Sequence, residues 1–551
     1  MWSALEFFAA GIVASPSTVA IALILCVFGY YSTSDRRARA LRKLPRPPST
    51  LPVLGNTMDV AKHHRERVHD WLYDESLPYA GKPWVMTTLG RTPAVVLCTE
   101  AHFDDVLRQQ FDVFIKGSLG SELARDFFGE GIFAVDDDKW RHQRKTASYL
   151  FSHQMMRDIM EQAVMEDAAQ VCTILERAAQ RGERVELKRL MDNYTTDVFT
   201  QIAFGERLGC LRGEHDFDPV FHQAFTRGPI AIQRRAQTPT WLWKLQRWLN
   251  VGPEKQFAED MEIVNRKVFE IVESVMKRSN DGSMDVEDSK AATKKNLISL
   301  FLNGPVVNDI EPTPTLIRDM ALNFIAAGRG TTAQSLSWFF VMINRHQSIY
   351  ENVMEEIRQE LPELVAGAKS VPSMDDVQRL VYLEATIKEC MRLYPPVPMN
   401  SRVARTDTTL SDGTFIPEGT RVIIPTYAVG RFKWIWGDDA SEFKPERWID
   451  ASTGKLTPVS PSKYLIFNAG PRYCLGAKLA MLEIKVLLSA ILSKFDVRIA
   501  RNPHDVVYAM SLALPIKGEL HADVRPVTPL KMPQEIAASA TTGASIVGVG
   551  G

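Results

Sequence analysis

The sequence lacks closely spaced cysteines and lacks net charge. Its 551 residues include six cysteines, and no two of them lie within the spacing of a CxxC motif or a zinc site. Cysteines scattered through a chain of this length argue against a disulfide framework and favour a reducing compartment. A formal net charge of -1 leaves no global charge that would attract nucleic acid or an acidic substrate. With 45% apolar residues, the chain is long enough to bury a large core.

Charge is also absent from the 28 residues between Phe7 and Ser34. A helix of about 20 apolar residues crosses a bilayer core, so this stretch is long enough, although Pro16 breaks or kinks its early part. Basic residues follow the apolar run, whereas a cleaved signal peptide carries them before it. This order predicts an uncleaved transmembrane signal anchor over residues 1–34, with the rest of the chain in the cytosol. A basic and proline-rich hinge, stiffened by four prolines, follows over residues 35–58.

Helical patterns dominate the rest of the chain, and strand-like runs are short. We predict a mainly α domain with small β-sheets over residues 59–533. A hairpin is predicted near its end, at residues 508–520. The last residues, 534–551, are rich in glycine, alanine and serine and are predicted to form a disordered tail.

One cysteine stands in a distinctive setting, in the stretch "FNAGPRYCLGAKLAMLEIK". Gly470, Gly476 and a proline form a tight loop that places the Cys474 sulfur at the N-terminus of an apolar helix, where a thiolate is stabilised. Such a thiolate is a good iron ligand. Gly476 would allow a flat cofactor to approach the backbone, and Arg472 is suited to pair with a carboxylate on that cofactor. A buried cysteine in a glycine loop is the plainer alternative, but the full pattern beginning at Phe467 is far more specific.

That pattern, Phe-x-x-Gly-x-Arg-x-Cys-x-Gly, resembles the haem-ligand signature of the cytochrome P-450 (haem-thiolate) superfamily. The resemblance covers almost the whole chain and implies the fold of that superfamily. It implies that Cys474 is the axial ligand of the haem iron. It further implies that the following residues bind the cofactor: Phe467, Gly470, Arg472 and Gly476 in the loop, Trp140 and Arg144 at i and i+4 in "KWRHQRK", and Arg402.

Two further segments match a structural element of the superfamily. "KECMR" places Glu389 and Arg392 at i and i+3, which alone is an ordinary helical ion pair. "FKPERW" supplies Arg447 downstream. The resemblance implies that the three form a buried triad, which we interpret as architecture because such a triad is costly unless it is fully paired.

The longest helical pattern contains "NFIAAGRGTTAQ" and ends at Arg345. Thr313 is suited to cap its start, and Pro314 to its first turn. The superfamily has a long central I helix over the haem, with the pattern Ala/Gly-Gly-x-acid-Thr. The resemblance implies that Gly328 opens a groove for dioxygen and that Thr331 steadies the bound oxygen, with the Thr332 hydroxyl beside it.

The acid of that pattern is missing, because Gly330 occupies its position. Asp319 lies three turns away, about 16 Å along the helix axis, and does not compensate. Arg329 is expected to point away from the haem, and it needs a partner or access to water. We predict that protons arrive through water and through the hydroxyl of Thr331 or its neighbour.

The predicted substrate lining is apolar, and each aromatic member is nearly as well explained as plain core. Its members are Phe114, Leu119, Phe127, Phe128, Phe324, Ala327, Val397, Met399 and Leu512.

The resemblance implies a monooxygenase with haem b, supplied with NADPH-derived electrons by NADPH-cytochrome P-450 reductase. The segments resemble most the fatty-acid and alkane ω-hydroxylase branch of plants and fungi. The expected substrate is therefore a lipophilic small molecule, hydroxylated at or near its terminal carbon. The expected location is the endoplasmic reticulum membrane, with the catalytic domain facing the cytosol. Two alternatives remain: an isomerase or dehydratase that acts on a peroxide without a reductase, and a non-catalytic haem protein.

Overall fold

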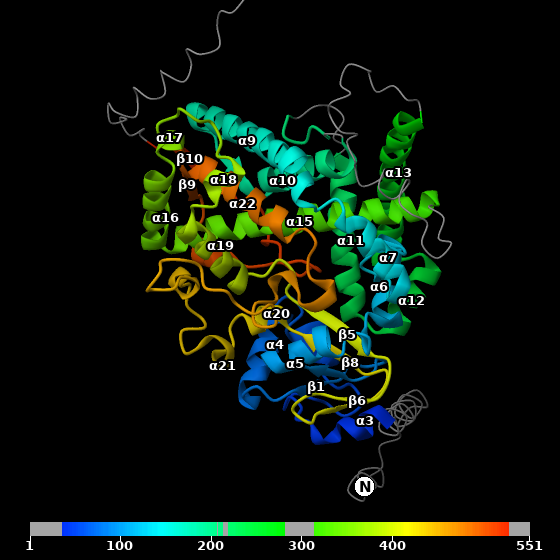
Figure 1. Cartoon of the computed structure of the whole chain (residues 1–551). Coiled ribbons are helices and arrows are strands. Elements are labelled where there is room, and N and C mark those ends of the chain that lie inside the picture. The colour runs from blue at the N-terminus through cyan, green and yellow to red at the C-terminus, as the bar shows by residue number, and fades with distance from the viewer. Residues whose placement is uncertain (1–35, 206–207, 213–218, 281–312, 528–551) are drawn as a thin grey trace, which may run out of the picture.

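The computed structural model describes residues 36–205, 208–212, 219–280 and 313–527, and it is mainly helical with small sheets (Figure 1). The predicted class, mainly α with small β-sheets, is confirmed. The predicted anchor over residues 1–34 and the predicted tail over residues 534–551 lie outside the described residues. Within the described ranges, no helix is both long and apolar enough to cross a membrane.

The elements range from single turns to the 32 residues of α15. The helices are α3 (Arg36–Ala40), α4 (Val68–Ser76), α5 (Glu100–Asp104), α6 (Gly117–Phe128), α7 (Asp137–Ser148), α8 (His153–Met155), α9 (Glu161–Arg181), α10 (Leu187–Phe204), α11 (Pro219–Gln237), α12 (Thr240–Leu249), α13 (Gly252–Asn280), α15 (Pro314–Arg345), α16 (Gln347–Glu360), α17 (Pro362–Val365), α18 (Met374–Val377), α19 (Val381–Leu393), α20 (Thr426–Val429), α21 (Lys433–Trp436) and α22 (Ala477–Leu492). The strands are β1 (Trp84–Met86), β2 (Ala94–Val96), β3 (Phe114–Ile115), β4 (Val185–Glu186), β5 (Asn400–Ala404), β6 (Thr408–Thr409), β7 (Phe415–Ile416), β8 (Arg421–Ile424), β9 (Phe495–Ile499) and β10 (His521–Pro526).

The largest sheet of the described residues has the order β1-β2-β8-β5-β3. β2 and β8 run parallel, with Val95 opposite Val422, and the other neighbours are antiparallel. The apolar side chains of β2 and β8 are fully buried, as expected for inner strands. The predicted hinge attaches to this sheet, because the Pro45 carbonyl accepts the Val85 N–H at 2.9 Å.

The predicted hairpin at residues 508–520 is present in a short form, with an antiparallel bridge between Tyr508 and Ile516. The Ala509 N–H donates to the Pro515 carbonyl at 2.7 Å, and the Lys517 N–H donates to the Val507 carbonyl at 2.8 Å. Pro515 has no N–H and cannot extend a ladder on this strand. The regular strand begins one residue later than the predicted hairpin ends, as β10, which pairs with β9 and β4.

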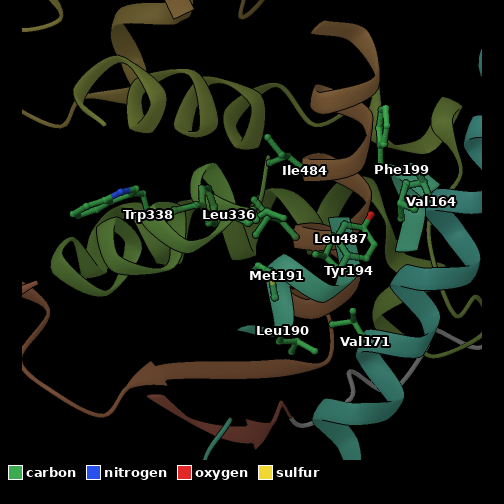
Figure 2. Packing of buried hydrophobic residues seen from close by; sticks show 14 of the residues in the cluster. Val164, Val171, Leu190, Met191, Tyr194, Phe199, Leu336, Trp338, Ile484 and Leu487 are labelled. Carbon is green, nitrogen blue, oxygen red and sulfur yellow. The ribbon is translucent and has the colours of Figure 1, made fainter. Parts of the chain in front are cut away.

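The long helix forms as its sequence predicts. The Thr313 hydroxyl accepts the Leu316 N–H at 3.2 Å, and Pro314 occupies the first turn. In Figure 1, α15 extends across the molecule between the helices above and the large sheet below. Figure 2 shows Tyr194 of α10, Leu336 of α15 and Leu487 of α22 in one apolar cluster. The helices that flank the functional site therefore share one core.

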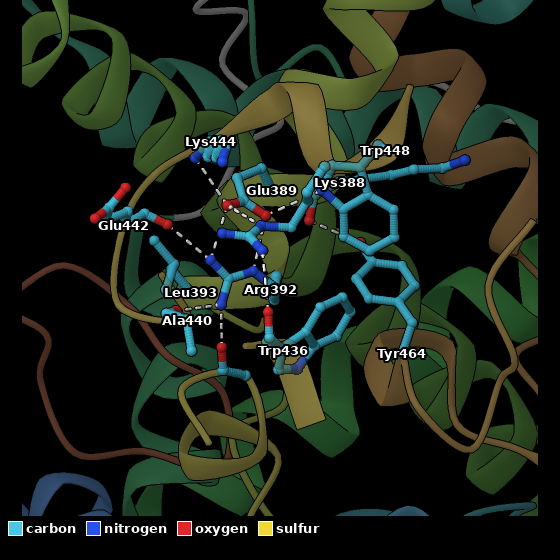
Figure 3. A network of polar contacts seen from close by, with 12 residues as sticks. Lys388, Glu389, Arg392, Leu393, Trp436, Ala440, Glu442, Lys444, Trp448 and Tyr464 are labelled. Atoms are coloured by element: carbon cyan, nitrogen blue, oxygen red, sulfur yellow. Dashed lines mark hydrogen bonds and ion pairs between the residues drawn. The ribbon is translucent and has the colours of Figure 1, made fainter. Parts of the chain in front are cut away.

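The predicted triad is confirmed (Figure 3). Arg392 donates through Nε and Nη2 to the two carboxylate oxygens of Glu389, at 2.7 and 2.8 Å. Arg447 Nε donates to the same carboxylate at 2.9 Å, and the Trp448 indole does so at 3.0 Å. The Lys444 backbone N–H adds a further bond at 2.8 Å. Glu389 is fully buried, so the dense pairing is what makes its charge tolerable.

Candidate active site

The cysteine loop is fixed by its own backbone. The Cys474 N–H donates to the Phe467 carbonyl at 2.8 Å. The chain turns through Asn468 and Gly470, each with a φ of 64°. A Cβ at Gly470 would lie 2.0 Å from the Leu107 carbonyl oxygen, so only glycine fits there. These contacts hold Cys474 just ahead of α22.

The Cys474 thiol is exposed, whereas the other cysteines of the described ranges are buried. The four buried cysteines pack as small apolar side chains. Desolvation by the surrounding protein raises the pKa of the Cys474 thiol, and the Gly476 N–H and the Arg144 guanidinium oppose that rise. The thiol is thus open to a ligand and faces groups that favour a thiolate.

A side chain at position 476 would not clash with the protein. A Cβ there would meet Phe151 at 3.6 Å, an ordinary contact distance. Packing within the protein therefore does not require a glycine, whereas a flat cofactor lying against the loop would. The role of Gly476 at the cofactor stays a prediction that this geometry permits.

Trp140 and Arg472 meet beside the loop. Arg472 donates to Asp136 Oδ1 at 2.7 Å and to the Val135 carbonyl at 2.8 Å. Its guanidinium carbon lies 4.5 Å from the centre of the Trp140 ring, and that of Arg144 lies 5.8 Å from the same centre. The structure therefore brings together the α7 residues and the loop residue that the sequence indicated.

Arg402 joins them from β5. Its side chain is buried, and Nη1 donates to the adjacent Ser401 carbonyl at 2.9 Å. Burial and, to a smaller extent, the charge of Arg472 lower the pKa of Arg402 to about 9, although Asp136 opposes the fall. No carboxylate among the described residues forms an ion pair with Arg402, so its charge has no anionic partner there.

Lys116 also lies close to Arg402 and Arg472, and the sequence alone did not indicate it. Burial lowers the pKa of its amine well below the usual range, and Arg402 and Arg472 lower it further. Lys116 follows β3, which pairs with β5, so strand pairing places it near Arg402. No local signal marks the residue, because a lysine before a helix is ordinarily solvated.

We call Lys116, Arg144, Arg402 and Arg472 the cation cluster. Asp136 opposes the lowering of the pKa values of Lys116, Arg402 and Arg472, and Asp137 also opposes that of Arg472. Within the cluster, the ion pair that the structure shows is the one between Arg472 and Asp136. Cations that are largely removed from water need anionic partners. The two propionates of a haem, together with the exposed Cys474 thiol, match this requirement. The residues present therefore fit the haem that the sequence implies.

The two threonines of α15 differ in their surroundings. Thr331 is partly buried, and its hydroxyl donates to the Ala327 carbonyl at 2.8 Å. Thr332 is buried, and its side chain opposes the rise of the pKa of the buried Glu483 carboxyl group on α22. Successive residues point about 100° apart around a helix, which accounts for the difference. Sequence reasoning looked for a compensating acid only along the same helix and so missed Glu483.

Gly328 is explained by the close crossing of α10 and α15. A Cβ at this position would lie 2.0 Å from Cδ2 of Phe199. The glycine is therefore required by the packing of two helices. Its predicted part in a dioxygen groove stays a prediction.

Arg329 was predicted to need a partner, and residues of α11 provide it. Arg329 is buried, and Nη2 lies 2.8 Å from His222 Nδ1 and 3.4 Å from the Thr226 hydroxyl. Its guanidinium carbon also lies 5.2 Å from the Phe225 ring centre. Burial and, next to it, the charge of Arg329 lower the pKa of His222 to about 3. The neutral imidazole is therefore the form that contacts the guanidinium.

The predicted substrate lining divides into two groups. Phe114, Phe127 and Phe324 are buried among other side chains, and the Phe127 ring centre lies 5.3 Å from that of Phe225. These three are core residues. The members that remain partly exposed are Phe128, Ala327, Val397, Met399 and Leu512. The side chain of Leu119 lies outside the described part of the structure.

Comparison with known proteins places this site in a family. The family model of cytochrome P450 matches residues 45–521. The chain is 30% identical to cytochrome P450 86B1 of Arabidopsis thaliana over 511 residues, which cover 90% of this chain and 88% of the relative. It is 31% identical to cytochrome P450 CYP94D108 of Paris polyphylla over 480 residues, or 86% of this chain and 92% of the relative. It is 32% identical to cytochrome P450 94C1 of Arabidopsis thaliana over 439 residues, or 78% and 83% of the two chains. The resemblance first seen in the cysteine loop is thus confirmed, and the chain belongs to the cytochrome P450 family as an oxidoreductase of the monooxygenase type.

Proposed function

We propose that this chain is a haem-thiolate monooxygenase that hydroxylates a fatty acid or an alkane at or near its terminal carbon. The observation that carries the proposal is the exposed Cys474 thiol beside the cation cluster, in which Arg472 forms an ion pair with Asp136. The substrate class rests on the branch of the family that the sequence resembles. Plant relatives of the 86 and 94 groups support that branch.

The protein's part is to hold the cofactor and to place the substrate. Cys474 would ligate the iron, and the cation cluster with Trp140 would hold the propionates. A haem b bound in this way activates dioxygen, with the thiolate donating electron density that favours O–O cleavage. The partly exposed apolar residues Phe128, Val397, Met399 and Leu512 would contact an alkyl chain.

We further propose that electrons come from NADPH through a membrane-bound NADPH-cytochrome P450 reductase. Exposed basic residues lie on the segments that carry the haem contacts, for example Arg141 on α7. Arg141 pairs with Asp112 and Asp138 at 2.9 and 3.1 Å, and pairs of such exposed charges are weak enough to be exchanged for a partner's acids.

We place the protein at the endoplasmic reticulum membrane, with the catalytic domain in the cytosol. Besides the apolar N-terminal stretch, α12 supports a membrane contact. Trp241, Leu245 and Trp248, at i, i+4 and i+7, are 55%, 42% and 80% exposed. Tryptophan and leucine on one helix face suit the boundary between headgroups and acyl chains.

Turnover of the full chain with a reductase and a panel of fatty acids and alkanes tests the function. We expect NADPH-dependent hydroxylation, with terminal products exceeding in-chain products. Conversion of a hydroperoxide without NADPH would instead favour the isomerase or dehydratase alternative. A reduced, CO-bound protein without the thiolate-type Soret band would refute the haem-thiolate site.

Protease added to intact microsomes tests the location. The catalytic domain should be digested without detergent if it faces the cytosol. Replacement of Trp241, Leu245 and Trp248 by serine should weaken the retention of a chain that lacks residues 1–34. Full protection of the domain in intact microsomes would contradict the proposed orientation.

A further inference from the structure

Asp136 stands at the start of α7 but does not cap it. An aspartate in this position commonly accepts a hydrogen bond from the first turn of its helix, which is worth about 1 kcal/mol. The Asp136 side chain accepts none from α7. Its two oxygens bind groups of other segments, so contacts with distant parts of the chain replace a local one.

The Asp136 carboxylate joins the cysteine loop to the turn after β3. Oδ1 accepts a hydrogen bond from Arg472 Nη2 at 2.7 Å, and the two side chains are only 17% and 7% exposed. Oδ1 also accepts the Lys116 N–H at 3.0 Å, and Oδ2 accepts the Gly117 N–H at 3.2 Å. Gly117 has a φ of 74°, and a Cβ there would lie 2.8 Å from Val403 Cγ2, so the turn around the carboxylate requires a glycine.

The same contacts fix the direction of Arg472. Its Nη2 atom also donates to the Val135 carbonyl at 2.8 Å, and its guanidinium carbon lies 4.5 Å from the centre of the Trp140 ring. Within the described ranges, the hydrogen bonds of Arg472 use this one nitrogen. The N–H groups on Nε and Nη1 therefore have a set direction and are left for a ligand.

Asp136 is also the counter-charge of the cation cluster. Among the described residues, its pair with Arg472 is the only ion pair that a member of the cluster forms. With the Lys116 amine protonated, the four cations exceed this one carboxylate by three charges. The two propionates of a haem and the Cys474 thiolate supply the same number. Without Asp136, repulsion between neighbouring cations such as Arg402 and Arg472 would be less compensated.

We propose that Asp136 is the positioning residue that prepares the haem site, because it directs Arg472 toward the propionates and holds the cation cluster together before haem binds. Asp136 touches no reacting atom and acts through Arg472. The sequence did not indicate this role, since an acid before a helix is already explained as a cap. The inference rests on the haem-thiolate site proposed above, and not on the substrate or on the source of electrons.

Two variants separate the charge of Asp136 from its geometry. Asp136→Asn keeps the shape of the side chain and removes the charge, whereas Asp136→Glu keeps the charge and displaces the oxygens. Asp137→Asn is the matched control, with the same chemical change at the next residue. Asp137 is 53% exposed and pairs with Arg405, so solvent already screens its charge. Asparagine also tolerates the φ of 55° at this position.

The first measurement is the rate at which the full-length holoprotein loses haem to an excess of apomyoglobin. Removal of a group that orients a cofactor contact commonly weakens binding about 10- to 100-fold. Asp136→Asn should therefore lose haem faster by a factor of this size, and Asp137→Asn should match the parent. Equal rates for the parent and a folded Asp136→Asn variant would overturn the proposal.

A double-mutant cycle tests whether Asp136 acts through Arg472. In an Arg472→Gln background, Asp136→Asn should add little to the rate of haem loss. A carboxylate that only ties the Lys116 turn to α7 would show its full effect there, and that result would overturn the proposal. If Asp136→Asn does not fold, Asp136→Glu replaces it in the same cycle, because its displaced oxygens also redirect Arg472.

The second measurement is the midpoint reduction potential of the iron, which a purely structural tie would not change. Loss of a negative charge beside the haem favours the reduced iron, so the potential of Asp136→Asn should become more positive. The potentials of Asp136→Glu and Asp137→Asn should stay close to that of the parent. A parental potential in Asp136→Asn would overturn the role as a counter-charge.

The spectrum of the reduced, CO-bound parent separates the two levels of the argument. A parent without the thiolate-type Soret band would refute the haem-thiolate site and this inference with it. A parent that shows the band, together with an Asp136→Asn variant that retains haem and potential unchanged, would refute only the role of Asp136.

Discussion

Glu389 and Glu483 are both enclosed by protein, with 0% and 2% of their surfaces exposed, yet their surroundings are opposite. Glu389 accepts hydrogen bonds from Arg392, Arg447, the Trp448 indole and the Lys444 backbone. The pKa of Glu483 is raised by burial, and among the described residues only Thr332 opposes that rise. The first is surrounded by donors that stabilise a carboxylate, and the second by apolar helices.

The difference shows that the surroundings of a buried glutamate decide whether it is ionised or protonated. Donors and positive charge around Glu389 make its anion a fixed junction between α19 and the segment after α21. The absence of such donors around Glu483 leaves the proton on its carboxyl group. Four predictions follow the comparison from its strongest expected effect to its weakest.

Removing the charge of Glu389 should have the largest effect. Glu389→Gln leaves the Arg392 guanidinium buried without a counter-charge, while Arg447 keeps its ion pair with Asp439. Loss of the buried carboxylate should lower the free energy of unfolding by about 3–5 kcal/mol. Urea denaturation followed by tryptophan fluorescence measures this. Glu442→Gln is the control, because Glu442 gives the network only its backbone carbonyl. Equal stabilities of the two variants would contradict the assigned role.

The second largest effect on stability is expected from a substitution in α15 that leaves both glutamates in place. In Gly328→Ala the new methyl group collides with Phe199, and overpacking of this kind costs about 1–3 kcal/mol. Gly330→Ala is its matched control, since that methyl group meets open space and alanine favours a helix by up to about 1 kcal/mol. The thermal midpoints of the two variants should therefore move in opposite directions. A shift of both in one direction would refute the close crossing with α10.

The pH dependence of stability should distinguish Glu483. Its folded-state pKa is raised, so the folded protein keeps a proton that the unfolded chain loses as pH rises above the ordinary pKa of a glutamate. Above that value, one retained proton lowers the stability by about 1.4 kcal/mol per pH unit, until the folded-state pKa is reached. Glu483→Gln should remove this loss, so the thermal midpoints of variant and parent should differ more at pH 8 than at pH 5. A difference that does not change with pH would show that Glu483 is ionised in the fold.

Loss of a surface ion pair should have the smallest effect on the free energy of unfolding. Arg184 Nε lies 3.0 Å from Asp523 Oδ1, and their side chains are 62% and 44% exposed. Arg184→Ala should change the free energy of unfolding by at most about 1 kcal/mol, because solvent and salt screen exposed charges. Denaturation at low and high salt checks this. If Arg184→Ala lowered the free energy of unfolding as much as Glu389→Gln does, burial would not explain why the two sites differ.

Much of the fold was predictable because its signals are local. The start of α15 at Thr313 and Pro314 follows from capping preferences, and its length follows from the apolar pattern. The triad was found because one pair lies at helical spacing. The hairpin at residues 508–520 forms but is shorter than predicted, because alternation of side chains does not reveal that Pro515 lacks the N–H needed to extend the ladder.

The sequence by itself determined the ligand loop. Gly470, Arg472, Cys474 and Gly476 act within a few residues of one another, so their spacing alone indicates their chemistry. It also revealed that position 330 lacks an acid. Only the tertiary structure decided which residues from distant segments complete the site. Strand pairing brings Lys116 to Arg402, and helix packing brings Glu483 to Thr332. Such contacts depend on how elements pack over separations of more than a hundred residues, and no local periodicity encodes that distance.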